Sequence, residues 1–282
     1  MTRSFDPRTH LRIRANRSNT KRSQLLAIST VIQNRDIKIC LNLFEHKVLT
    51  THQINDLFFN SYSRTRSRLL RLHRAGIVDR FTPYVERGSA PNHYMLGDLG
   101  AHLVAGELGM EVREIIRGLN KLSSQTRSQR LQHMVEVNGF FARLAWGCRQ
   151  TTDHFLTEWW SEKKTHRSWG EIVSPDGFGQ LQGPGQSRTF FLELDRGTES
   201  PSRLAMKLAG YEEASLARDR PDLLLFCFPD QSREVAVRKV LHPSGIPIAT
   251  TTIERHRFDP LGQIWLPLGN GHRARLLEVF HE

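Results

Sequence analysis

Three short segments with apolar residues at helical spacing follow one another between residues 36 and 76, and they restrict what the first third of the chain can form. In the first segment, residues 36–50, the apolar positions fall near a 3.6-residue period, which predicts a helix with one buried face. The second helix is predicted to follow Thr51 as its N-cap, and the third to begin near Ser61 and end at Gly76. Three short helices with brief connections are typical of a helix-turn-helix domain.

The residues after the third predicted helix indicate which kind of helix-turn-helix domain this is. Residues 77–81 are predicted to form a short strand, and residues 82–92 are polar and rich in turn formers. Residues 93–105 are predicted to return as a strand and then a helix. A strand, a turn-rich stretch and a returning strand make a wing. We therefore expect a winged helix-turn-helix DNA-binding domain over residues 25–106.

The third predicted helix carries many basic side chains. Leu69, Leu70 and Leu72 are expected to face the core, which leaves the basic residues for the outer face. Arginine suits phosphate oxygens and guanine edges, and a helix N-terminus favours an anion. A face exposed only to solvent is the alternative, but such faces usually mix both signs of charge. The expected DNA contacts are Ser63, Arg64, Thr65, Arg66, Arg68 and Arg71 on this helix and Arg87 in the turn-rich stretch.

The net charge of +11 is concentrated in two places. Residues 1–22 carry a net charge of +6 and residues 61–80 carry +5, whereas residues 129–282 contain 19 basic and 19 acidic residues. A polyanion is therefore expected to bind the N-terminal part of the chain. Residues 1–24 have few apolar side chains and are expected to form a flexible basic arm, which either follows DNA or is simply a solvated tail.

Composition excludes several other classes of protein. The chain has 282 residues and 38% hydrophobic residues, which predicts two globular domains rather than a disordered chain. No stretch reaches the ~18 apolar residues that span a bilayer, and the N-terminus lacks the apolar run of a signal peptide, so we expect a cytoplasmic protein without a membrane partner. Cys40, Cys148 and Cys227 have no pair spacing typical of zinc sites or disulfides and are expected to be reduced thiols.

The second half of the chain is expected to form a mixed α/β domain over residues 129–282, after a connector at residues 107–128. A packed helix is predicted over residues 131–149. The predicted elements after it are strands at 154–160 and 171–177, a loop at 177–187, a strand at 188–195, a helix at 201–218, a strand at 222–228, a helix at 233–241 and a strand at 248–254.

Three carboxylates in this half could carry chemistry. Asp176 is placed at the end of the second predicted strand, and Glu193 and Asp195 are two apart on the third, so their side chains point to one face. If these strands form a hairpin, the carboxylates converge as a hard cation such as Mg²⁺ requires. The alternative is structural: Asp176 caps a turn, and Asp195 pairs with Arg196 or Arg203.

The segments LTTHQINDLFF and RTRSRLLRLHRAGIVDRF, the pair Val137-Asn138, and the strings PDG and FFLELDRGTES followed by Lys207 and Tyr211 resemble the replication-relaxation proteins of plasmids and mobile elements over residues 36–215. The resemblance implies a protein required for plasmid replication and for relaxation of supercoiled plasmid DNA, acting with other replication or mobilisation proteins. It also implies that the second half has a restriction-endonuclease-like fold.

The catalytic pattern of that fold is an Asp after Pro, followed by Glu-x-Lys on the next strand. Pro175-Asp176 and Glu193 match it, but Asp195 stands where the Lys belongs, which argues against nuclease activity. Lys207 on the adjacent helix is a candidate replacement, although it also fits a surface ladder of ion pairs. The resemblance thus implies Asp176, Glu193, Asp195 and Lys207 as catalytic positions and Asp176 and Glu193 as ligands of a possible Mg²⁺.

Three functions are consistent with these features. The leading hypothesis is a binding protein whose winged helix contacts double-stranded DNA and whose α/β domain is a scaffold or docking surface. The second hypothesis is a metal-dependent endonuclease or nickase. The third is a transcriptional repressor, for which the winged helix alone would suffice.

Overall fold

The structure is a computed structural model, and it describes residues 32–83, 88, 90–123, 129–169, 172–216 and 223–279. The chain divides into two compact units, residues 1–128 and residues 129–282. Within the described residues, none of the helices combines the length and the apolar character needed to cross a membrane. Cys40, Cys148 and Cys227 are buried free thiols, which agrees with the prediction of reduced cysteines.

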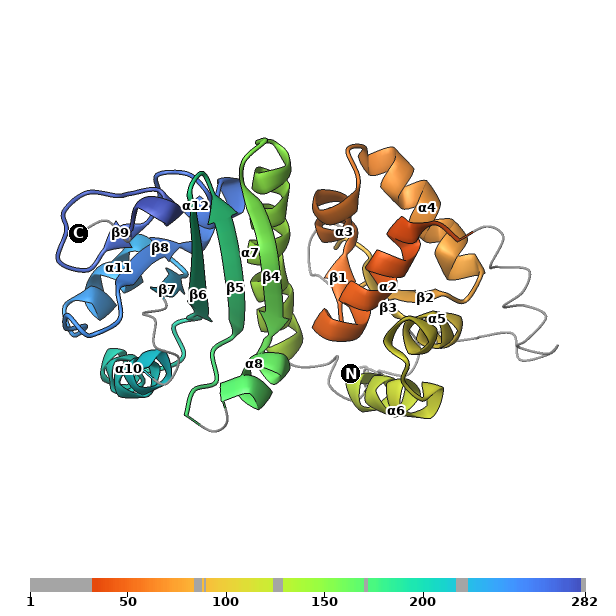
Figure 1. Cartoon of the computed structure of the whole chain (residues 1–282), viewed down its shortest axis with the longest axis horizontal. Helices are drawn as coiled ribbons and strands as arrows, with labels where there is room; N and C mark the ends of the chain where they lie inside the picture. Colours follow the sequence, from red (N-terminus) through yellow and green to blue (C-terminus); the bar gives the residue numbers. More distant parts are fainter. Residues whose placement is uncertain are drawn as a thin grey trace, which may run out of the picture. The chain divides into compact units, whose positions relative to one another are not determined.

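The first unit consists of helices packed on a small antiparallel sheet (Figure 1). The sheet has the strand order β1-β3-β2. The elements in chain order are α2 (Asn34–His46), β1 (Leu49–Thr50), α3 (Thr51–Phe58), α4 (Tyr62–Arg74), β2 (Val78–Phe81), β3 (His93–Leu96), α5 (Asp98–Leu108) and α6 (Val112–Ser123).

Local chemistry explains where the helices of the first unit begin and end. Thr50 caps α3: its side chain accepts a hydrogen bond from the Gln53 backbone N–H, and the Gln53 side chain accepts one from the Thr50 N–H. The prediction of Thr51 as the cap is therefore wrong by one residue, because the reciprocal Thr–Gln pair makes Thr50 the N-cap and Thr51 the first helical residue. Gly76, with φ of +72°, follows α4 in the left-handed conformation that favours glycine and ends this helix as predicted.

The second unit is a six-stranded mixed sheet with helices on both faces (Figure 1). The strand order is β4-β5-β6-β7-β8-β9; β6, β7 and β8 are parallel and the other pairs are antiparallel. The elements in chain order are α7 (Gln129–Arg149), β4 (Phe155–Ser161), α8 (Glu162–Trp169), β5 (Gly177–Gly183), β6 (Gln186–Leu194), α9 (Pro201–Met206), α10 (Leu208–Leu216), β7 (Leu223–Phe228), α11 (Gln231–Arg238), β8 (Ile248–Thr252), α12 (Ile253–Phe258), β9 (Leu266–Pro267) and a final 3₁₀ turn (Leu276–Glu278).

Each face of this sheet has its own apolar core. Alternate residues of β6 point to opposite faces, so Leu192 packs with Phe140 of α7 whereas Phe191 packs with Tyr211 of α10. The first core also includes Trp265 and the C-terminal segment, and the second includes residues of α9 and α11. The mixed α/β architecture expected for this half is therefore present.

The strands before β6 differ from the prediction. Residues 172–176 form no strand, and the predicted loop at 177–187 is strand β5 followed by a tight turn into β6. Glycines account for the error, because Gly179 resembles a loop residue in sequence. In the structure Gly179 leaves room for Phe190, whose ring would lie 2.4 Å from a Cβ at this position.

Candidate functional site

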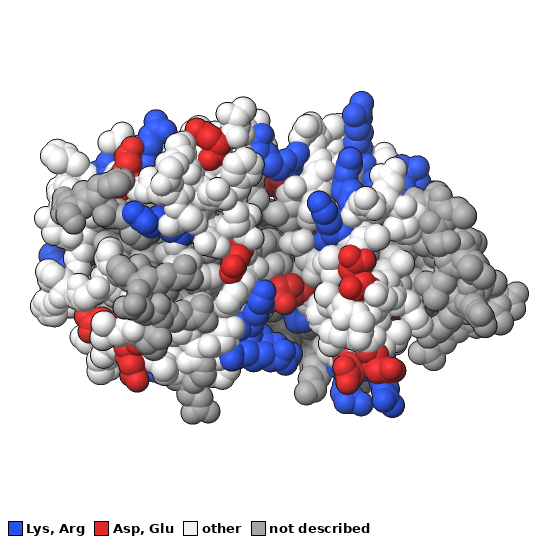
Figure 2. Space-filling view, viewed as in Figure 1, with Lys and Arg blue, Asp and Glu red and all other residues white. Residues whose placement is uncertain are grey.

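The outer face of α4 carries exposed basic side chains. Arg64, Arg66 and Arg71 are exposed together with Ser63, whereas Leu69 and Leu72 are buried in the core of the first unit. Figure 2 shows Lys and Arg side chains gathered over the part of this unit where Figure 1 places α4. Leu70, which was expected to face the core, is half-buried at the border of the two faces.

Two residues expected on this outer face are buried instead. The Thr65 hydroxyl oxygen lies 2.9 Å from Asn55 Oδ1 and 2.9 Å from the Ser61 carbonyl oxygen, and its single proton serves these two acceptors. The Arg68 guanidinium forms a two-point ion pair with the fully buried Asp36, with Nε 2.9 Å from Oδ1 and Nη2 bonded to Oδ2. Both residues lie on the helix face of the buried leucines, so their assignment to the outer face is wrong. Arg87 lies outside the described residues.

A shallow cavity of about 270 Å³ borders the outer face of α4. The Arg35 guanidinium stacks over the Phe59 ring, 4.5 Å from its centroid, which holds this cation at the rim. The cavity therefore presents a fixed arginine together with arginines of α4 to an anion. Its lining residues are Gln33, Arg35, Phe59, Ser63, Arg64, Ser67, Arg68 and Arg71.

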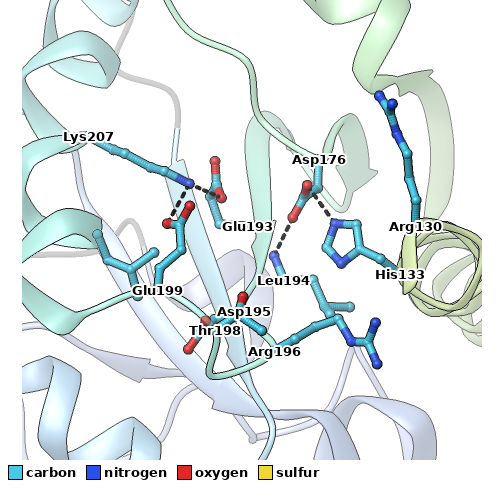
Figure 3. A pocket seen from close by; sticks show the side chains of 11 residues that line it. Arg130, His133, Asp176, Glu193, Leu194, Asp195, Arg196, Thr198, Glu199 and Lys207 are labelled. Carbon is cyan, nitrogen blue, oxygen red and sulfur yellow. Dashed lines mark hydrogen bonds and ion pairs between the residues drawn. The ribbon is translucent and has the colours of Figure 1, made fainter. Parts of the chain in front are cut away.

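The three carboxylates of the second unit line one cavity of about 290 Å³, shown in Figure 3. Asp176 directly precedes β5 rather than ending a strand, Glu193 lies near the end of β6, and Asp195 follows that strand. The β5–β6 hairpin brings the start of β5 beside the end of β6, because Gly177 pairs with Leu192. The complete lining is Arg130, His133, Asp176, Glu193, Leu194, Asp195, Arg196, Thr198, Glu199, Leu204 and Lys207.

Asp176 is held by α7 and by β6. Its Oδ1 lies 2.8 Å from Nε2 of His133, and its Oδ2 accepts a hydrogen bond of 2.8 Å from the Leu194 backbone N–H. Burial lowers the pKa of His133, but the hydrogen bond and charge of Asp176 more than offset this, so the His133 pKa is raised above its usual value. Both oxygens of Asp176 therefore have partners inside the protein.

Glu193 is buried on the other side of the cavity. Its Oε1 accepts a hydrogen bond from the Tyr211 hydroxyl, and its Oε2 lies 3.4 Å from Nζ of Lys207. Burial, followed by the negative charge of Asp176, raises the pKa of Glu193 to about 7, although Lys207 and Tyr211 oppose this rise. Lys207 lies in the break between α9 and α10, which were predicted as one helix, and also pairs with Glu199 at 3.1 Å.

Asp195 pairs with an arginine that the sequence did not indicate. Its Oδ2 accepts from Nε of Arg233 at 2.6 Å, and its Oδ1 accepts from the Gly197 backbone N–H at 2.9 Å. The predicted partners are wrong, since Arg196 lies 3.7 Å from Glu136 and Arg203 lies 3.9 Å from Glu199. Asp195 shares the α11 side of the sheet with Arg233, whereas Arg196 reaches α7.

This arrangement does not fit a Mg²⁺ ion. All four oxygens of Asp176 and Glu193 are engaged, by His133, the Leu194 N–H, Tyr211 and Lys207. A cation bound to both carboxylates would have to share these oxygens with the donors already present, one of which is the cationic Lys207. Among the residues that the structure describes, no group of three or more His, Cys, Asp or Glu side chains is arranged to hold a metal ion.

Sequence reasoning missed two residues that organise the cavity. His133 lies 43 positions before Asp176 and Arg233 lies 38 positions after Asp195. Neither residue belongs to a local motif, and only the sheet topology brings α7 and α11 to these carboxylates. A single sequence offers no signal for such long-range pairs.

Comparison with known proteins identifies the family. No curated protein and no solved structure matches the chain. A family model described as replication-relaxation matches residues 42–221, which is well over half of the chain. This chain therefore belongs to the replication-relaxation family, and the membership suggests a role in plasmid or mobile-element replication.

Proposed function

We propose that this protein binds double-stranded DNA through a winged helix formed by residues 32–108, and that it acts in plasmid or mobile-element replication together with other replication or mobilisation proteins. The observation that carries the proposal is the exposed face of α4, where Arg64, Arg66 and Arg71 project while the opposite face is buried. This role places the protein in the cytoplasm.

The packing of the first unit supports α4 as the DNA-contacting helix. A winged helix consists of three helices and a small antiparallel sheet, and the first unit contains such elements. We take α3 and α4 as its helix-turn-helix pair. The buried pair of Arg68 and Asp36 fixes α4 against α2, so its outer arginines are presented on a rigid helix. Arg35 beside the same cavity adds a further cation for a phosphate.

The test is a set of arginine substitutions with a control in the same unit. Replacing Arg64, Arg66 and Arg71 together by Ala is expected to nearly abolish duplex binding in an anisotropy titration, because each base-reading arginine contributes about 1–3 kcal/mol. Replacing the exposed Arg113 and Arg117 of α6 by Ala removes charge from the same unit and is expected to change affinity much less. Wild-type affinity for duplex DNA in the variant that lacks Arg64, Arg66 and Arg71 would refute the proposal.

We infer for the second unit a restriction-endonuclease-like fold that serves as a scaffold and does not cut DNA. Pro175-Asp176 before β5 and Glu193 on the next strand have the order that this fold implies. The sequence predicted inactivity from the negative charge of Asp195. That argument is weakened because the positive charge of Arg233 offsets the charge of Asp195. The stronger reason is that the oxygens of Asp176 and Glu193 already have donors.

The second candidate function is a metal-dependent nickase, and one observation favours it. Lys207, in the break between α9 and α10, lies 3.4 Å from Glu193 and lines the same cavity as Asp176. Incubation of supercoiled plasmid with the protein and Mg²⁺ or Mn²⁺ separates the two candidates. The scaffold proposal expects no relaxed product, whereas nicking that disappears in both Glu193→Gln and Lys207→Ala would establish the nickase.

A further inference from the structure

A row of arginine and aromatic side chains lies along α7 and α12, and we call it the α7–α12 strip: Arg143, Trp146, Arg257 and Phe258. The Arg143 guanidinium stacks over the Trp146 ring, 3.9 Å from its centroid, and its Nε donates a hydrogen bond of 3.2 Å to the Phe258 carbonyl. The Phe258 side chain is 82% exposed, which makes it the most exposed large hydrophobic residue of those described.

The packing of α12 against α7 fixes the helix that carries this exposed ring. His256 and Ile253 of α12 are buried, and the His256 ring packs edge-on against Phe140 at 5.4 Å between centroids. Gly147 of α7 allows Leu261, just after α12, to approach to 3.2 Å from where a Cβ would stand. The buried side of α12 is thus anchored against α7 (Figure 1), and Phe258, the last residue of α12, is exposed.

The strip is continuous with the cavity of the carboxylates. Glu136 of α7 lies 3.7 Å from Arg257 of the strip and 3.7 Å from Arg196 of the cavity lining. A single glutamate is thus shared by two arginines, one of the strip and one of the cavity lining. Arg130, which also lines the cavity, belongs to the first turn of α7 and is exposed. Arginines therefore extend from the cavity along α7 to Trp146, about 24 Å by the helical rise.

We propose that the α7–α12 strip binds single-stranded DNA, with its bases stacked on the exposed ring of Phe258 and its phosphates paired with Arg143 and Arg257. Arginines beside exposed aromatic rings are the combination that single-strand-binding surfaces use. A duplex keeps its bases stacked on one another, so it cannot use the Phe258 ring. This site is separate from the duplex contact proposed for α4 and does not depend on it.

The test compares two substitutions of Phe258 in the full-length protein. Phe258→Leu keeps an apolar side chain but removes the flat ring, and it is expected to weaken binding of a labelled oligothymidine of about 15 nucleotides by about tenfold. Phe258→Tyr keeps the ring and is expected to bind as the wild type does. Since the side chain is largely exposed, both variants are expected to fold normally.

Two arginine variants provide a charge-matched comparison. Arg143→Ala in the strip is expected to weaken oligothymidine binding severalfold. Arg167→Ala removes an exposed arginine of α8, which packs with the core on the other face of the sheet, and is expected to change nothing. Equal losses in the two variants would mean that only net charge matters and would refute a specific strip.

The variant of α4 that lacks Arg64, Arg66 and Arg71 separates this proposal from the previous one. It is expected to lose duplex binding and to retain oligothymidine binding that remains sensitive to Phe258→Leu. Wild-type oligothymidine affinity in both Phe258→Leu and Arg143→Ala would overturn the strip as a nucleic-acid site, whatever the duplex result. Wild-type duplex affinity in the α4 variant would overturn only the role of α4.

Discussion

At the scale of single residues, the buried ion pair of Arg68 and Asp36 holds the first unit together. Both side chains are almost completely inaccessible, and Asp36 also accepts a hydrogen bond of 2.8 Å from the Gln33 backbone N–H. Removing one partner of a buried pair leaves the other charge without compensation. We expect Arg68→Met to destabilise this unit by about 3–5 kcal/mol.

The measurement for this prediction can treat the two units separately. All five Trp residues belong to residues 129–282, so tryptophan fluorescence reports the second unit and far-UV circular dichroism reports both. In Arg68→Met, an early unfolding step is expected in circular dichroism with no change in fluorescence. Adding Asp36→Asn removes the buried charge while keeping an oxygen for Gln33, so the double variant is expected to recover part of the loss. A double variant less stable than Arg68→Met would contradict this account.

The raised pKa of Glu193, about 7, predicts a stability that depends on pH. The folded protein holds this proton more tightly than the unfolded chain does, so the free energy of unfolding falls as pH rises from about 4.5 through about 7. His133, whose pKa is also raised, acts in the same direction at pH values above its usual 6.5. We expect urea unfolding followed by tryptophan fluorescence to show this fall in the wild type and a smaller one in Glu193→Gln. Identical pH profiles would show that Glu193 does not titrate in this range.

At the scale of elements, strand β5 shows where sequence reasoning loses accuracy. Helices α2, α3, α4 and α7 were predictable because their apolar residues repeat with the helical period, and cap residues also marked the start of α3 and the end of α4. Strand β5 was predicted as a loop because three of its seven residues are Gly. Those glycines accept the rings and side chains of neighbouring elements, a contact that no local pattern encodes.

We predict that Gly179→Ala destabilises the second unit. A Cβ at this position would lie 2.4 Å from the Phe190 ring and 2.9 Å from the Phe141 ring, so both rings must move within a closely packed core. Overpacking of this kind costs about 1–3 kcal/mol. Gly245→Ala is the matched control, because nothing lies within 4 Å of its Cβ position. Tryptophan fluorescence during urea unfolding measures both variants, and equal stabilities would contradict the packing argument.

The candidate site was predictable only in its local part. The Pro175-Asp176 pair and the two-residue spacing of Glu193 and Asp195 follow from the sequence, although Asp195 lies just after the strand, and a hairpin is sufficient to bring them to one cavity. The partners His133 and Arg233 come from α7 and α11, and only the order of strands and helices decides which carboxylate each one meets. The sequence therefore indicated the carboxylates and Lys207 but not His133 and Arg233, which pair with two of these carboxylates.

At the scale of the whole molecule, the positive charge is concentrated where duplex contact is proposed. Residues 1–22 carry +6 and residues 61–80 carry +5, and together these equal the net charge of the chain. In the second segment, however, Arg68 is committed to Asp36, so fewer cations remain for DNA than the sequence count suggests. Residues 1–22 lie outside the described residues, and their part in binding is a question for experiment.

The last prediction is that residues 1–22 contribute to duplex binding chiefly through counterion release. Each phosphate neutralised by Lys or Arg adds about 0.9 to the slope of log affinity against log salt concentration. Replacing the seven basic residues of this segment by Gln is therefore expected to flatten the slope by several units while leaving tryptophan fluorescence and circular dichroism unchanged. Deleting the segment is expected to give the same slope, because charge and not chain length is responsible. An unchanged slope in both variants would show that the segment does not contact DNA, and it would leave the arginines of α4 as the source of the salt dependence.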